Sequence, residues 1–212
     1  MKKSVLTLIA AAAMVVAGSA QAVELSGNVA ITNDYVWRGI SQTNEDPAIQ
    51  GGFDLEADGF YAGIWGSNVN FGGVDESTEF DVYFGYGGDI TDELSFDVGF
   101  IRYEYPGISA VSFNEIYGSL SFMGATIGVA LDNDNDATYI NLGYDLSLPN
   151  DFGVGFHYGD YSFDGGGDYN DYSITLSKSA GGFDFSLAWI DTDLSGVAIA
   201  DSRVVFAIAK SL

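Results

Sequence analysis

Residues 33–70 read NDYVWRGISQTNEDPAIQGGFDLEADGFYAGIWGSNVN. A long polar loop spans residues 38–47, a strand with alternating apolar and polar residues spans 48–56, and a second strand begins at Phe60. The tripeptide Ala57-Asp58-Gly59 suits a tight turn between them, because glycine accepts a positive φ. Alternating strands that are joined by a long loop at one end and a short turn at the other are typical of the hairpins of a membrane β-barrel.

The same unit repeats along the rest of the chain. Alternation with a period of two predicts twelve strands, near residues 23–31, 48–56, 60–68, 79–86, 94–100, 115–122, 126–132, 139–146, 152–159, 171–177, 183–189 and 204–212. Tight turns follow the even-numbered strands and longer loops follow the odd-numbered ones, which is the asymmetry of a barrel whose termini share one side. We therefore predict an all-β fold, an antiparallel up-and-down transmembrane β-barrel of about twelve strands.

The polarity of the two strand faces favours lipid on the outside. A secreted soluble barrel or β-sandwich also has alternating strands. Here, however, the polar face carries Asp, Glu, Ser, Thr, Gly and Tyr, which are too polar and too small to fill a dry core. Aromatic residues also gather near the strand ends, as at the two interfaces of a membrane barrel. We predict that Phe84, Val98, Leu142 and Phe185 contact acyl chains while carboxylates face a wet interior.

The first 22 residues, MKKSVLTLIAAAAMVVAGSAQA, have the features of a secretory signal peptide. Two lysines precede an apolar run that is well short of the ~20 residues of a transmembrane helix, and small residues follow it. We predict a signal peptide over residues 1–22 and an outer-membrane β-barrel over residues 23–212. The sequence has no cysteine, so the exported domain is expected to fold without disulfides.

The chain is strongly acidic, with 30 Asp and Glu residues, seven Lys and Arg residues and a formal net charge of −23. This balance excludes nucleic acid as a partner, because phosphate contacts need clustered basic side chains. Acidic residues on the polar strand faces would attract cations into an open interior and repel anions. The predicted interior acids are Asp54, Glu56, Glu79, Asp81, Asp97, Glu115, Asp132, Asp145, Asp171 and Asp184.

Two basic residues and one acidic loop lie near the predicted rim. Arg38 and Arg102 would constrict the pore, bind lipopolysaccharide phosphates or form local salt bridges. The loop 132–136, DNDND, begins like a calcium-binding loop. It has Ala137 where such a loop has glycine and Gly143 where it has glutamate, so we expect a solvated loop, no metal site and no cofactor.

His157 is the single histidine, and it faces the predicted interior. Folding its hairpin brings it near Asp171 and Ser173, a set of residue types that also serves in outer-membrane lipid hydrolases and acyltransferases. No recognisable nucleophile motif accompanies these residues, so we expect a hydrogen-bonded wall residue and no enzymatic activity.

The opening segment resembles the TorF family of exported bacterial porin-like proteins. The resemblance rests on DYVWRGISQT (34–43), DPAIQG (46–51), GFYAG (59–63) and GSNV (66–69), with looser matches at YPG (105–107) and RVVF (203–206). It covers essentially the whole predicted barrel. The resemblance implies an outer-membrane location and a channel-like role, and it implies no particular substrate.

These observations predict a porin-like channel for the passive diffusion of small polar solutes, with a preference for cations. The expected partners are outer-membrane lipid, lipopolysaccharide and the barrel assembly machinery. One alternative is a closed barrel with a structural, adhesive or divalent-ion-binding role, and another is a lipid-modifying enzyme that uses His157. Twelve strands leave room for a narrow pore at most, and in-folded loops would plug it.

Overall fold

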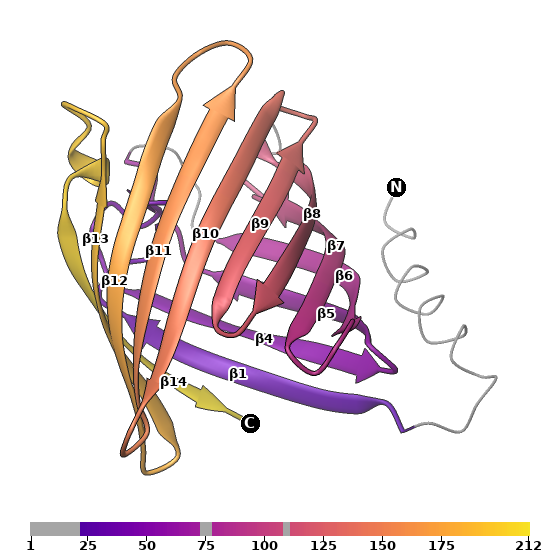
Figure 1. Cartoon of the computed structure of the whole chain (residues 1–212). Coiled ribbons are helices and arrows are strands. Elements are labelled where there is room, and N and C mark those ends of the chain that lie inside the picture. The colour runs from indigo at the N-terminus through magenta and orange to yellow at the C-terminus, as the bar shows by residue number, and fades with distance from the viewer. Residues whose placement is uncertain (1–21, 73–77, 108–110) are drawn as a thin grey trace.

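The computed structural model describes residues 22–72, 78–107 and 111–212 and shows a closed antiparallel barrel of twelve strands (Figure 1). The predicted all-β barrel and its number of strands are therefore confirmed. The predicted signal peptide lies outside the described residues apart from Ala22. The barrel strands are β1 (Glu24–Thr32), β4 (Ala48–Ala57), β5 (Phe60–Ser67), β6 (Glu79–Asp89), β7 (Leu94–Glu104), β8 (Phe113–Phe122), β9 (Ala125–Asp132), β10 (Ala137–Leu148), β11 (Phe152–Phe163), β12 (Tyr169–Ala180), β13 (Phe183–Thr192) and β14 (Arg203–Ser211).

The first barrel strand closes the sheet. On one side β1 pairs with β14, so that Ile31 lies opposite Ile208, and on the other side it pairs with β4, so that Ile31 lies opposite Ile49. Each strand between β4 and β14 pairs with its neighbours in sequence, as in an up-and-down barrel. Closure leaves no unpaired sheet edge, so the backbone hydrogen bonds of the wall are made within the sheet.

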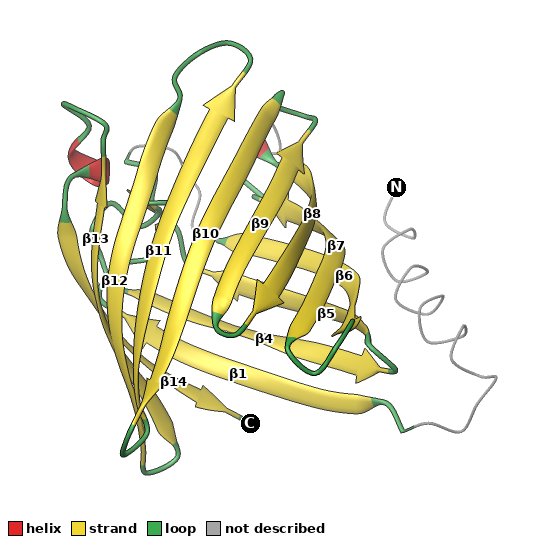
Figure 2. Cartoon of the chain, viewed as in Figure 1, coloured by secondary structure: helices red, strands yellow, loops and turns green. Residues whose placement is uncertain are grey.

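Short elements within the described residues connect the strands without being part of the barrel wall. The two-residue strands β2 (Val36–Trp37) and β3 (Ile40–Ser41) pair with each other between β1 and β4, and the 3-10 helix η2 (Ala198–Ala200) precedes β14 (Figure 2). We call the end of the barrel that carries these elements the loop end and the opposite end, with the short connections, the turn end. No helix within the described residues has both the length and the apolar character needed to span a membrane.

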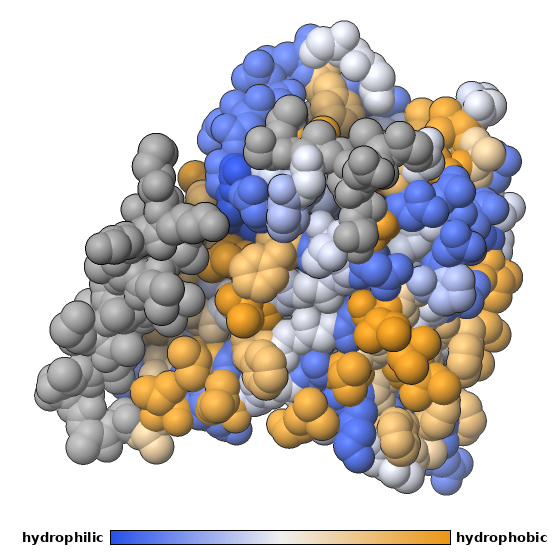
Figure 3. Space-filling model, turned by 180° about the vertical axis from the view of Figure 1, so that it is seen from behind, coloured by the Kyte–Doolittle hydropathy of each residue, from blue (hydrophilic) through white to orange (hydrophobic). Residues whose placement is uncertain are grey.

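The outside of the barrel is apolar and the inside is polar. Phe84, Val98 and Leu142 are 56%, 49% and 50% exposed, and their strand neighbours on the opposite face are hydrophilic or small. Figure 3 shows apolar side chains gathered over the lower part of one outer face, with hydrophilic side chains above them. The large fully buried side chains include those of Glu79 and Glu115, which is the reverse of a soluble core.

Candidate constriction inside the barrel

The loop between β1 and β4, residues 33–47, folds into the barrel, and we call it the inner loop (Figure 1). The β2–β3 hairpin forms its innermost part. The backbone N–H of Gln42 donates to the carbonyl of Tyr35 at 2.6 Å, and the N–H of Asn70 donates to the carbonyl of Gln42 at 2.8 Å. These hydrogen bonds join the loop both to itself and to the chain that follows β5.

The tip of the inner loop contacts the wall at close range. Arg38 and Gly39 turn the chain with φ values of 46° and 80°. The hydroxyl of Tyr169 on β12 donates to the carbonyl of Arg38 at 3.0 Å. A Cβ atom on Gly39 would lie 2.8 Å from the Cβ of Asp171 and would clash with the methyl group of Thr192. Glycine at position 39 therefore satisfies both the backbone conformation and the close approach.

The base of the inner loop is held by a buried acid. Asp34 accepts hydrogen bonds from the hydroxyls of Ser41 at 2.6 Å and Thr43 at 2.9 Å. Its other oxygen pairs with Nη1 of Arg203, the first residue of β14, at 2.8 Å. This network joins the inner loop to β14. It is shielded from solvent, because Asp34, Ser41 and Thr43 are each at most 4% exposed.

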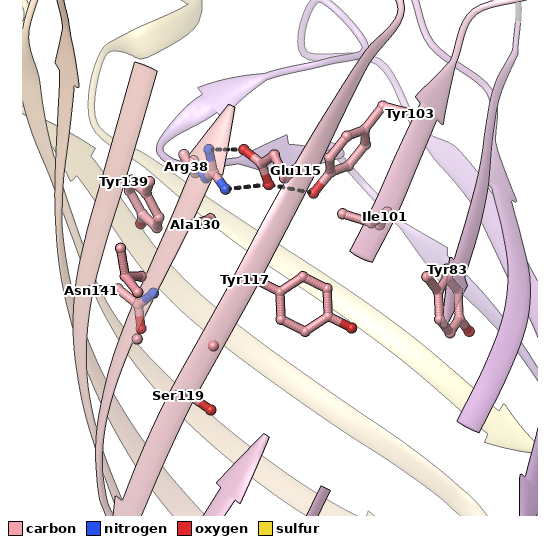
Figure 4. Close-up of a pocket in the computed structure, with 13 residues that line it drawn as sticks. Arg38, Tyr83, Ile101, Tyr103, Glu115, Tyr117, Ser119, Ala130, Tyr139 and Asn141 are labelled. Atoms are coloured by element: carbon pink, nitrogen blue, oxygen red, sulfur yellow. Dashed lines mark hydrogen bonds and ion pairs between the residues drawn. The ribbon is translucent and has the colours of Figure 1, made fainter. Parts of the chain in front are cut away.

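A bidentate ion pair joins the tip of the loop to the opposite wall. Arg38 Nη1 lies 2.7 Å from Oε1 of Glu115 on β8, and Nη2 lies 2.9 Å from Oε2 (Figure 4). The Tyr103 hydroxyl on β7 donates to the same carboxylate at 3.2 Å. The side chains of Arg38 and Glu115 are only 9% and 2% exposed. Such a fork geometry is the strongest form of the arginine–carboxylate pair.

Aromatic rings surround the Arg38 guanidinium. Its Cζ lies 4.2 Å from the ring centre of Trp37, 4.1 Å from that of Tyr139 and 4.7 Å from that of Tyr161. Burial acts to lower the pKa of Arg38, but the adjacent Glu115 carboxylate outweighs it, and the net effect raises the pKa above its usual value. The cation is therefore held in place by charge and by cation–π contacts together.

A cavity of about 440 Å³ lies below this ion pair. Besides Arg38 and Glu115, its lining includes phenol, amide and hydroxyl groups, as Figure 4 shows. These polar side chains include Tyr83, Tyr103, Tyr117, Ser119, Tyr139 and Asn141. A compartment of this size with hydrogen-bonding groups on its wall suits small polar solutes or water.

Tyrosines on the inner wall lie over glycines. The ring of Tyr61 occupies the space beside Gly85, and the ring of Tyr117 occupies the space beside Gly99, where any side chain would collide with them. The two hydroxyls meet at 2.6 Å, and Tyr61 also donates to Asp97 at 2.8 Å. Glycine thus lets these rings lie along the wall and keeps the interior from filling.

The ten predicted interior acids do not form one ring, because they differ in burial and in position along the strands. Five are buried at the loop end, around the inner loop: Glu79, Asp81, Glu115, Asp132 and Asp171. Asp54 and Asp97 are half-buried. Three acids near the turn end are exposed: Glu56, Asp145 and Asp184. Several are already hydrogen-bonded, such as Asp54 to the Tyr83 hydroxyl. Their part in selecting ions stays a prediction.

The two predicted rim arginines have different surroundings. Arg38 is inside the barrel, as described above. Arg102 lies on the outer face, because its neighbour Tyr103 points inward, and it forms a local ion pair with Glu104 at 3.0 Å. Both partners are about one-third exposed, with side-chain exposures of 34% and 37%. Of the alternatives for Arg102, the structure therefore shows the local salt bridge.

The expected proximity of His157 and Asp171 is present. His157 Nε2 lies 3.0 Å from Asp171 Oδ1 and 2.9 Å from the Tyr139 hydroxyl, which donates to Asp171 Oδ2. Ser173 is opposite His157 in the β11–β12 register, but within the described residues no hydrogen bond joins the two. Asp171 and the Tyr139 hydroxyl both contact the same ring nitrogen, Nε2, so the observed arrangement is a hydrogen-bonded cluster of these three side chains.

The acidic loop 132–136 is also organised by its own hydrogen bonds. Asp132 Oδ1 accepts the backbone N–H groups of Asp134 at 2.9 Å and Asn135 at 3.1 Å. Asp132 Oδ2 accepts the Asn135 amide at 2.6 Å. Among the residues with described positions, no three His, Cys, Asp or Glu side chains are grouped as metal ligands.

Sequence reasoning did not find the aromatic surroundings of Arg38 or the Asp34–Arg203 pair. One sequence feature points to the aromatic surroundings of Arg38. The alternation places Tyr103, Tyr139 and Tyr161 on the inward face, near the loop ends of their strands. The Asp34–Arg203 pair joins residues 169 positions apart, and only the closed barrel brings them together.

Comparisons with known proteins add a family and a fold. A family model described as "Bacterial protein of unknown function (Gcw_chp)" matches residues 16–211. No curated protein matches the chain. The KdgM porin is similar in structure, with a TM-score of 0.59 and 8% identity over 90% of this chain and 98% of that one.

Two further solved barrels are similar. The NanC porin has a TM-score of 0.56 and 11% identity over 88% of this chain and 98% of that one. LpxR from Salmonella typhimurium has a TM-score of 0.54 and 9% identity over 88% and 99%. At these identities the likeness shows the barrel fold alone, and the resemblance to the TorF family is not confirmed.

Proposed function

We propose that this chain, which belongs to the Gcw_chp family of bacterial proteins, is an outer-membrane channel of the porin type for small polar solutes. One observation supports the proposal above the others: the closed barrel is apolar outside and carries carboxylates, phenols and a cavity inside. A wall of this polarity suits lipid around it and water within it. The channel-like role that the resemblance to the TorF family implies stays a prediction.

We further propose that the inner loop sets the width of the passage. Its tip reaches Glu115 on the opposite wall, and its base is fixed to Arg203, so it crosses the interior at the loop end. Solutes reach the cavity from the turn end, where Glu56, Asp145 and Asp184 are exposed. The arrangement is a channel with a constriction rather than an open tube.

The acidic interior favours cations and neutral solutes. The KdgM porin has been solved in complex with disordered oligogalacturonate, which is an anionic saccharide. In this chain the interior arginine is already paired with Glu115 and surplus carboxylates line the turn end, so the field inside would repel such a polyanion. Within the shared fold, we expect the charge of the wall to set the solute class.

The selectivity of the channel can be measured directly. Reconstituted in a planar bilayer under a salt gradient, the protein is expected to show a reversal potential on the cation-selective side. The triple variant Glu56→Gln, Asp145→Asn, Asp184→Asn should move this potential toward zero, because it removes the exposed interior carboxylates. Asp92→Asn, in the exposed β6–β7 connection, is the control and should leave the potential unchanged. A folded barrel that inserts and carries no current would contradict the proposed channel.

The position of the bilayer can be tested at two adjacent residues. Leu142 is 50% exposed on the outer face, and Asn141 lines the cavity. Leu142→Arg should lower the free energy of unfolding from lipid vesicles by about 2–4 kcal/mol, because it places a charge against hydrocarbon. Asn141→Arg puts the same charge into the polar interior and should cost much less. Equal costs for the two variants would argue against lipid on the outer face.

A further inference from the structure

Two acidic side chains of β6 are buried together inside the barrel. Glu79 and Asp81 are two positions apart on one strand, so they share a face, and they are only 1% and 4% exposed. Both side chains therefore lie on the same face of β6, one pleat apart. Glu79 Oε2 and Asp81 Oδ1 have no hydrogen-bond partner within the part of the chain that the structure describes. These are the two buried side-chain atoms for which the described contacts give no partner.

The surroundings of this pair are mainly tyrosine side chains. Val69, Tyr103 and Tyr105 form a buried cluster beside it. Arg38 and Arg203, the arginines inside the barrel, are bound to Glu115 and Asp34. Within the described ranges, no ion pair involves Glu79 or Asp81.

The inner loop closes one side of the pair. The hydroxyl of Tyr35 donates to Glu79 Oε1 at 3.0 Å. On the other side, Asp81 is opposite Tyr103 in the sheet register, and Tyr103 lines the cavity below the loop. The pair therefore lies between the loop and the cavity.

Two buried carboxyl groups in such a place have to be neutralised, either by a proton or by a bound cation. A buried charge without a neutralising partner is strongly unfavourable, and two like charges close together add repulsion. A bound divalent cation would neutralise both carboxylates and would satisfy the two free oxygens. The donors are all hard oxygen atoms, which select alkaline-earth ions over the softer transition metals.

We propose that Glu79 and Asp81 bind a divalent alkaline-earth cation, with Ca²⁺ as the best fit, at the junction of β6 and the inner loop. Ca²⁺ suits the pair because it accepts one or two oxygens from each carboxylate in an adaptable geometry and completes its shell with water. The site goes beyond the proposed channel function, since binding does not require conduction. It would also strengthen the docking of the inner loop, because Tyr35 is hydrogen-bonded to a ligand of the ion.

The proposal is tested by calorimetric titration of Ca²⁺ into the full, folded barrel in detergent, after treatment with a chelator. We expect one saturable site and a higher melting temperature with Ca²⁺ than without it. Glu79→Gln and Asp81→Asn should each weaken Ca²⁺ binding on the order of tenfold or more. Asp92→Asn removes an equal charge from the exposed β6–β7 connection and should bind Ca²⁺ like the wild type.

Two outcomes would overturn the site. One is the absence of saturable Ca²⁺ binding together with an infrared band of a protonated carboxyl group at neutral pH. If that band disappears in Asp81→Asn, the two carboxyl groups share a proton instead of a cation. The other is Ca²⁺ binding that Glu79→Gln and Asp81→Asn leave unchanged while both variants keep the barrel spectrum. Neither outcome depends on the bilayer current, so the cation site and the channel can fail separately.

Discussion

Arg38→Met is expected to lower the free energy of unfolding by about 3–5 kcal/mol, because it leaves the Glu115 carboxylate buried without its partner. The same change should release the tip of the inner loop and raise the single-channel conductance. Methionine keeps most of the volume between the aromatic rings, so the lost charge is the main difference. Urea unfolding in lipid vesicles and planar-bilayer recording on the same preparation measure the two effects.

Two controls separate this effect from a general loss of arginine. Arg102→Met removes the exposed pair with Glu104 on the outer face and should cost at most about 1 kcal/mol. Arg38→Met combined with Glu115→Gln removes both charges and should recover much of the lost stability while the conductance stays high. If Arg38→Met matched Arg102→Met in both measurements, the ion pair would not hold the loop.

Gly39→Val is expected to open the passage without changing any charge. Gly39 has a φ of 80°, and a Cβ there would clash with Thr192 and crowd Asp171, so the loop tip has to move off the wall. The conductance should rise above that of the wild type. Protease sensitivity of the inner loop should rise with it, because the released segment becomes accessible.

A second glycine supplies a matched control for the backbone. Gly166 has the same φ of 80°, but nothing lies within 4 Å of a Cβ placed on it. Gly166→Val should therefore cost only the backbone strain, about 1–3 kcal/mol, and leave the conductance at the wild-type level. A rise in conductance in both variants would attribute the effect to general destabilisation rather than to the docking of the loop.

The sequence alone predicted the wall of the barrel. Alternation along a strand is a local property, so residues such as Phe84, Val98 and Leu142 could be assigned to the outer face from their neighbours. The number of strands and the placement of turns followed from the same signal. Strand ends are set by pairing: alternation predicts a strand over 139–146, whereas β10 extends over Ala137–Leu148, because pairing with β11 continues past the alternating segment.

The tertiary structure decided what lies inside the wall. The loop 33–47 has no periodic pattern, so its sequence did not show that it folds inward or that Arg38 meets Glu115, 77 positions away. Nor did alternation distinguish the exposed Glu56 from the buried Glu79, since both simply have the inward phase. The physical reason is that the side-chain period fixes which face a residue is on, whereas burial and pairing depend on which distant segments closure of the barrel brings together.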